Sequence, residues 1–160
     1  MDITALAHHI LRMLYRRGGH EVGILATADK SGVPHSVYMG TVTSPVVDRL
    51  LTMTAPESRK IANILENPRV EWLFVDEEKE ELLYLYGKAR VLEEPAEVEA
   101  AWQKISDKSR AYFMLYQDVG IQFLIVETEV EKFEYRVPRK NEVHVATAAE
   151  IRSVLAEENV

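Results

Sequence analysis

The sequence contains no cysteine among its 160 residues, which excludes disulfide bonds, thiolate catalysis and cysteine-ligated metal sites. It also lacks any run of about 20 apolar residues, the length that a membrane-spanning helix requires. Basic residues are fewer than acidic ones: the chain has 19 Lys and Arg and 26 Asp and Glu, which gives a formal net charge of -7. Nucleic-acid binding needs a concentrated basic surface, and this balance argues against one. We therefore expect no nucleic-acid and no membrane partner, and a cytoplasmic location.

What the sequence does contain is a series of short apolar segments separated by turn residues. An apolar fraction of 47% over this length is sufficient for the core of one domain. Short hairpins between consecutive strands favour a small antiparallel Greek-key barrel over a doubly wound sheet. The predicted fold class is mainly β with flanking helices, with six strands at 22–27, 34–42, 49–53, 70–75, 82–92 and 120–137.

The predicted barrel domain spans residues 1–138 and includes an N-terminal amphipathic helix that ends at Gly18-Gly19. Residues 139–160 are predicted to form a C-terminal helical extension. Thr147 and Glu150 supply a capping-box pattern for its helix. We expect this extension to pack either on the barrel or on a second copy of the chain.

Two irregularities in the strand patterns predict distortions of the sheet. Gly40 interrupts a strand, which indicates a bulge, a close approach by a backbone or flat ligand, or a simple kink. Val130 falls out of phase with the apolar alternation of the last strand. A break of this kind indicates a bulge that bends the strand, as a barrel requires.

The stretch after the third strand carries the clearest candidate site. Thr54, Pro56 and Glu57 are typical of a helix start, and Asn67-Pro68 is typical of its end. The tripeptide 58–60, Ser-Arg-Lys, would then lie in or near the first turn. Two cations there oppose the helix dipole, but they suit a bound phosphate. The alternative is a solvated helix start whose cations aid solubility.

Other polar or aromatic segments have plainer interpretations. His8 and His9 lie on the first helix without a second ligand at helical spacing, so they predict surface or packed histidines and no metal site. The acidic run 76–81 is typical of a solvated loop tip. The aromatic segment 112–116 either packs in the core or covers a ligand or partner. His35 is the one tempting proton relay, with a solvent-facing strand histidine as the alternative. No catalytic residue is assigned.

An ordered set of short motifs now suggests a family. The chain resembles the pyridoxamine 5'-phosphate oxidase-like superfamily of FMN-binding split barrels, and within it the general stress protein 26 group. The similarity covers about residues 20–137. It rests on Ala26-Thr27, Gly32-x-Pro34-His35, Thr54, Ser58-Arg59-Lys60, Asn67-Pro68-Arg69-Val70 and Gly87-Lys88-Ala89.

The resemblance implies a homodimer with FMN at the subunit interface. By position, Ser58, Arg59 and Lys60 would hold the FMN phosphate, while Met53 and Thr54 would contact phosphate or ribityl. The segment 112–116 would supply the partner's contribution. Backbone groups of one strand would lie along the isoalloxazine ring, and the residues of that strand are Val37, Tyr38, Met39, Gly40, Thr41 and Val42.

Departures from the family pattern argue against a true pyridoxine-phosphate oxidase. Val37 and Val42 stand where that enzyme has an arginine and a lysine, Leu82 replaces a glutamine, and 143–160 lacks its C-terminal tryptophan and arginine. The expected function is an FMN-dependent oxidoreductase acting on a small molecule. The alternatives are a non-catalytic flavin-binding stress protein and a haem- or deazaflavin-binding relative on the same barrel.

Overall fold

The computed structural model describes residues 1–117, 120 and 122–159. Ile121 of the predicted last strand and Val160 of the predicted extension lie outside the described residues. No helix within the described part is long and apolar enough to cross a membrane. The elements are α1 (Ile3–Leu14), β1 (Glu21–Ala28), β2 (Pro34–Val46), β3 (Arg49–Thr54), α2 (Arg59–Glu66), β4 (Arg69–Asp76), β5 (Glu81–Val91), α3 (Pro95–Lys104), α4 (Asp107–Gln117), β6 (Leu124–Val137), a 3₁₀ turn η1 (Pro138–Lys140), β7 (Glu142–Thr147) and α5 (Ala148–Glu158).

Six of the strands form a closed antiparallel barrel, which confirms the predicted fold class. The strand order is β3-β2-β1-β4-β5-β6, and pairing of β3 with β6 closes the ring. Apolar side chains at alternate positions fill the interior, and Trp72, Leu83 and Phe133 have no exposed surface. The Trp72 indole nitrogen donates a hydrogen bond of 3.0 Å to the Thr128 hydroxyl, so its polar group is satisfied in the core.

The barrel closes around a bulge in β6, as the phase of Val130 predicts. Gly87 pairs with Val130 and Tyr86 pairs with Lys132, so Glu131 is the extra residue. The two backbones approach so closely that a Cβ at position 87 would lie 2.0 Å from the Glu129 carbonyl oxygen. Only glycine fits there. A second irregularity occurs at Gly40, since Met39 pairs with Gly23 but Val42 pairs with Glu21. The interpretation of Gly40 as a bulge is therefore confirmed.

The C-terminal segment differs from the predicted helical extension in its first half. Residues Glu142–Thr147 form β7, which pairs with β6 beyond the six barrel strands. Val143 and Val145 on this strand are both 53% exposed, so the valine side chains face solvent. The strand therefore lacks the buried apolar face from which the other strands were predicted. The Thr147–Glu150 capping box is present at the start of α5. Ile151 of α5 is fully buried in the core cluster that also contains α1 residues.

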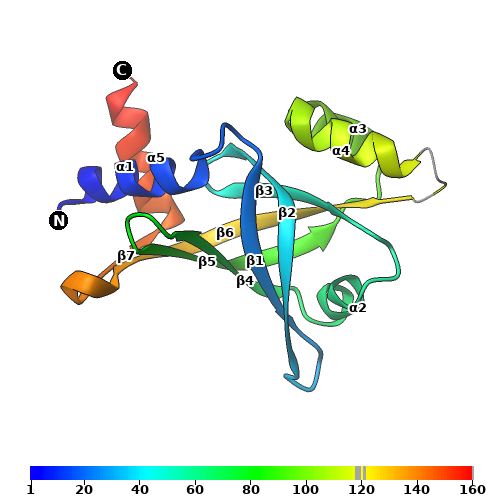
Figure 1. The fold of residues 1–160 in the computed structure, drawn as a ribbon, viewed down its shortest axis with the longest axis horizontal. Coiled ribbons are helices and arrows are strands. Elements are labelled where there is room, and N and C mark those ends of the chain that lie inside the picture. Colours follow the sequence, from blue (N-terminus) through cyan, green and yellow to red (C-terminus); the bar gives the residue numbers. More distant parts are fainter. Residues whose placement is uncertain (118–119, 121, 160) are drawn as a thin grey trace.

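The helices divide between the two ends of the barrel (Figure 1). Helices α1 and α5 lie side by side at one end, while α2, α3 and α4 lie toward the other. The predicted N-terminal helix ends earlier than expected, at Leu14, so that Arg12 is the basic residue of its last turn. Helix α4 contains the aromatic segment 112–116, for which the sequence analysis predicts no secondary structure.

Candidate functional site

The entrance of α2 is built differently from the sequence prediction, but it places the same three residues together. Thr54 is the last residue of β3 and pairs with Leu124, so it does not cap the helix. A turn over 55–58 follows, Ser58 is the N-cap residue, and Arg59 is the first helical residue. Because β3 pairs with β6 as far as Thr54, this residue belongs to the strand, and Ser58 takes the N-cap position predicted for Thr54. Ser58, Arg59 and Lys60 still form the first turn.

The charges of this turn have no opposite charge paired with them in the part of the chain that the structure describes. Arg59 is exposed and Lys60 is half-buried, and the first turn contains no acidic residue. Within the described part of the chain, neither cation forms an ion pair. Burial lowers the pKa of Lys60 below its ordinary value, and no carboxylate offsets that effect. The backbone N–H groups of a helix start add to the positive potential. An anion bound here would be favoured by all of these groups.

A cavity of about 410 Å³ lies beside this entrance, between the middle of β2, the end of β3 and helix α4. We call it the β2–β3 groove. It gathers six of the predicted site residues from two consecutive strands, and those on β2 lie 12 or more positions before those on β3. Its described lining consists of His20, Tyr38, Met39, Gly40, Thr41, Met53, Thr54, Ala55, Tyr112, Phe113 and Phe123.

Side chains of the predicted strand segment alternate between the groove side and the barrel core. Val42 is only 1% exposed, and Val37 packs against the core cluster, so neither side chain lines the groove. Tyr38 is 69% exposed. The space beside Gly40 is open, because a Cβ there would meet only the Tyr38 ring edge, at 3.8 Å. A planar ligand could therefore approach the β2 backbone at Gly40.

His20 lines the groove and is missed by the sequence analysis. Its Nδ1 lies 2.6 Å from the hydroxyl of Ser109, which is fully buried at the start of α4. Burial lowers the pKa of His20 below its ordinary value, and the nearby cations Lys108 and Arg17 lower it further. The ring is therefore neutral near pH 7. With Nδ1 engaged by Ser109, Nε2 has no other partner among the described residues. By contrast His35, the tempting candidate in the sequence, pairs with Thr27 at the far end of the β1–β2 hairpin and does not line the groove.

The aromatic segment of α4 both packs and lines the groove. Phe113 is buried and contacts Phe123 edge-on, with ring centroids 4.4 Å apart. Tyr112 contacts Phe113 edge-on at 5.5 Å and is 46% exposed. One chain therefore supplies an aromatic wall to its own groove. The sequence offered the concentration of aromatics as a signal, but not the side of the helix that faces the barrel.

Comparisons with known proteins agree with this architecture. Residues 12–154 match the family profile described as "Pyridoxamine 5'-phosphate oxidase". No curated protein matches the sequence. Among solved structures, a protein related to general stress protein 26, from Clostridium acetobutylicum, has a TM-score of 0.68 at 16% identity, covering 94% of this chain and 99% of that one.

Two further structures share the fold at low identity. A pyridoxamine 5'-phosphate oxidase-related, FMN-binding protein from Nostoc punctiforme has a TM-score of 0.62 at 16% identity, over 89% of this chain and 94% of its own. A haem-binding protein from Mycobacterium smegmatis has a TM-score of 0.69 at 18% identity, over 92% of this chain and 60% of its own. One barrel thus serves proteins described with two different cofactors.

Proposed function

We propose that this chain, which belongs to the pyridoxamine 5'-phosphate oxidase family, binds FMN in the β2–β3 groove and acts as an FMN-dependent oxidoreductase on a small molecule. The observation that carries the proposal is the convergence of the open backbone at Gly40 with the cations at the start of α2, which form no ion pair among the described residues. A planar ring and a phosphate are the two ends of one cofactor. The fold and the motifs support the same assignment.

The phosphate would be held at the first turn of α2. Arg59 offers a planar set of donors and Lys60 a point charge, while Ser58 adds a hydroxyl and its backbone N–H. The half-buried Lys60 ammonium has lost water without gaining a carboxylate. Phosphate oxygens would replace that water. Thr54, whose hydroxyl lies 3.5 Å from that of Ser58, connects this turn to the groove.

The ring would lie along β2. The residues 38–41 present backbone N–H and C=O groups beside the open space at Gly40, and Met53 and Thr54 close the side toward the phosphate. FMN, when bound, supplies the redox chemistry, and the protein supplies binding, orientation and electrostatics. The neutral His20 ring can hold or release a proton at Nε2 at the edge of the groove. Phe113 and Phe123 keep water from that wall.

The expected substrate is not pyridoxine phosphate. Val37 and Val42 give the core apolar side chains at positions where the true oxidase has cations, and the segment 142–158 is used for β7 and α5. We expect the active form to be a cytoplasmic homodimer in which a second copy completes the groove over the exposed Tyr38. Sedimentation velocity of the purified protein tests whether it is a dimer.

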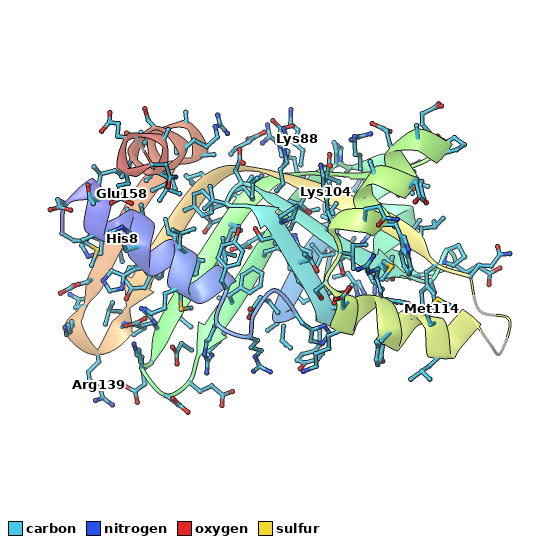
Figure 2. The ribbon with its side chains drawn as sticks, turned by 90° about the horizontal axis from the view of Figure 1, so that it is seen from above. His8, Lys88, Lys104, Met114, Arg139 and Glu158 are labelled. Carbon is cyan, nitrogen blue, oxygen red and sulfur yellow. The ribbon has the colours of Figure 1, made fainter. Side chains whose placement is uncertain are left out.

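The test is FMN affinity in matched variants. The purified protein should show flavin absorbance, and mass spectrometry of the released ligand should identify FMN. Arg59→Ala and Lys60→Ala should each weaken FMN binding by about 1–3 kcal/mol, the range of a charge-assisted hydrogen bond. The control is Arg139→Ala with Lys140→Ala, since Arg139 lies at the opposite end of the molecule (Figure 2). Unchanged affinity in the Arg59/Lys60 double variant would refute the site. Turnover of NADH or NADPH by the flavin-loaded protein separates an oxidoreductase from a non-catalytic flavin store.

A second candidate function, haem binding, is favoured by His20. The imidazole of His20, whose Nε2 has no partner among the described residues, would be the donor that holds a haem iron in this aromatic groove. A Soret band in the purified protein, lost in His20→Ala, supports haem. Flavin absorbance that survives His20→Ala supports FMN instead.

A further inference from the structure

A second and larger cavity lies next to the β2–β3 groove and shares three lining residues with it. Its volume is about 820 Å³, within the usual range of small-molecule pockets. We call it the helix pocket, because α2, α3 and α4 surround it together with the ends of β3, β5 and β6. Its described lining consists of Met53, Ile61, Leu65, Val91, Leu92, Glu93, Val98, Glu99, Trp102, Phe113, Met114, Phe123, Leu124 and Ile125.

The wall of the helix pocket is apolar and rich in polarizable groups. It contains the indole of Trp102, the rings of Phe113 and Phe123, and the thioether of Met114. Leu65 and Met114 are 68% and 48% exposed, so part of this apolar surface faces solvent. Large exposed apolar surface of this kind is typical of binding sites. Figure 2 shows Met114 on α4, at the end of the molecule away from His8 and Glu158.

The charges at the helix pocket all have one sign. Among its described lining residues the only charged side chains are Glu93 and Glu99, both exposed. The Glu99 carboxylate accepts a hydrogen bond of 2.8 Å from the neutral amide of Gln103, and neither carboxylate forms an ion pair within the described part of the chain. The net charge of -7 reinforces the negative potential. An anionic ligand would be repelled from this pocket.

Aromatic faces combined with carboxylates are the chemistry that recognises organic cations. Apolar substituents gain from burial against the pocket wall, while the positive charge gains from the indole face and from Glu93 and Glu99. We propose that the helix pocket binds an apolar organic cation, such as a quaternary or aromatic ammonium compound. This site is distinct from the flavin site, which is built on cations, although Met53, Phe113 and Phe123 line both cavities.

The proposal is tested with two ions of nearly equal shape and opposite charge, tetraphenylphosphonium and tetraphenylborate. Calorimetry on the full chain, with and without FMN, should show saturable binding of the phosphonium and weaker binding of the borate. Glu93→Gln with Glu99→Gln should weaken phosphonium binding by about threefold to tenfold, as expected for two exposed charge pairs. Borate binding should not weaken in this variant.

Matched variants separate the site from the general charge of the protein. Glu78→Gln with Glu157→Gln removes two exposed carboxylates elsewhere and should leave phosphonium binding unchanged. Met114→Lys should weaken phosphonium binding more than Met114→Gln, because only the first change adds a cation to the pocket. Arg59→Ala with Lys60→Ala should lower FMN affinity without affecting the phosphonium, so the two sites can fail separately.

Three outcomes would overturn the proposal. The first is equal affinity for the two ions, and the second is an equal effect of the Glu93/Glu99 and Glu78/Glu157 double variants. The third concerns a second copy of the chain as the occupant. If Met114→Lys abolishes a dimer while phosphonium binding is unchanged, the helix pocket is an interface between copies.

Discussion

The two ends of the barrel differ in how buried or half-buried charged groups are paired. At the end covered by α1, the guanidinium of Arg12 pairs with Glu81 and with Asp76, at 3.4 Å from the Asp76 carboxylate. It also lies 3.0 Å from Nδ1 of His9, whose ring stacks on Tyr135 with centroids 4.9 Å apart. Asp76 is 4% exposed. Every charge of this network finds its partner inside the chain.

At the other end, Arg90 pairs with Glu97 and Arg110 pairs with Asp107, but the first turn of α2 and the rim of the helix pocket lack such partners among the described residues. Within the described residues, Arg59 and Lys60 have no carboxylate, and Glu93 has no cation. Leu65 and Met114 expose apolar surface beside them. The difference indicates where each end gets its stability. Contacts within the chain hold the α1 end, while the α2–α4 end is arranged for contacts with other molecules.

The largest expected effect is at the α1 end. Arg12→Met leaves Glu81 without its cation and Asp76 with only Arg16, at 3.6 Å, and we expect a loss of about 2–4 kcal/mol in the free energy of unfolding. Urea denaturation measures it. The control is Arg139→Ala, which removes an exposed ion pair with Glu80 at the same end and should have an effect of about 0–1 kcal/mol. Similar losses in the two variants would contradict the contrast between the ends.

A smaller effect of opposite sign is expected at the α2 end. Arg59→Glu places an anion at the first position of α2, where the helix dipole favours it, and should stabilise the protein without FMN by about 0.3–1 kcal/mol. Urea denaturation at low salt measures the gain. Lys88→Glu makes the same change in net charge on β5 and should give no gain (Figure 2 shows Lys88). With FMN present, Arg59→Glu should lose the stabilisation that the cofactor confers on the parent chain. Destabilisation by Arg59→Glu without FMN would show that Arg59 is a structural residue.

The smallest effect concerns pH and involves one histidine at each end. Burial lowers the pKa of His9, with a further contribution from Arg12, and burial likewise lowers the pKa of His20. As pH falls below about 6.5, the unfolded chain binds protons that the folded chain binds less readily, so the free energy of unfolding should decrease. His9→Gln and His20→Gln should each reduce this decrease between about pH 7.5 and pH 5.5. Burial raises the pKa of Glu21, which stabilises the fold at lower pH and opposes the trend there.

An acid dependence that is unchanged in both histidine variants would contradict this account. If only His9→Gln reduces the loss of stability at low pH, then His20 is solvated. In that case the two ends of the barrel also differ in the protonation of their histidines. Either result is obtained from the same set of urea titrations at several pH values.

The sequence predicted the barrel because its strands carry local signals. Hairpin residues such as Gly32, which has a φ of 84°, and the phase break at Val130 depend only on neighbours in the chain. The edge strand β7 was not predicted, because its valines face solvent and the segment lacks the buried apolar alternation of the other strands. Thr54 was assigned to the wrong element, since the pairing of β3 with β6 is a contact between distant segments.

The candidate site stays a prediction with two sources. The tripeptide 58–60 follows from the helix-start pattern, and the segment 37–42 follows from the family resemblance, while the structure places six of the predicted residues at one groove. His20 was not predicted, because its place in the groove depends on Ser109, 89 positions away. The spacing of Leu65 from Ile61 predicts that both lie on the buried face of α2, yet Leu65 is exposed beside the helix pocket. A helix wheel shows which side chains share a face, but it does not show that a cavity rather than a core lies beneath it.

The extra residue in β6 constrains how this chain can change in length. Before Glu131 the strand pairs with β3 and β5, and after it the strand pairs with β5 and β7. Deleting Glu131 would leave Val130 and Phe133 facing inward with Lys132 facing outward between them, so the side chains on both sides would keep their faces and only the local bend would be lost. Deleting a residue elsewhere in β6 would put the side chains between that position and the bulge on the opposite face. The stretch around Glu131 is therefore where this strand can lose one residue and keep its inside–outside pattern.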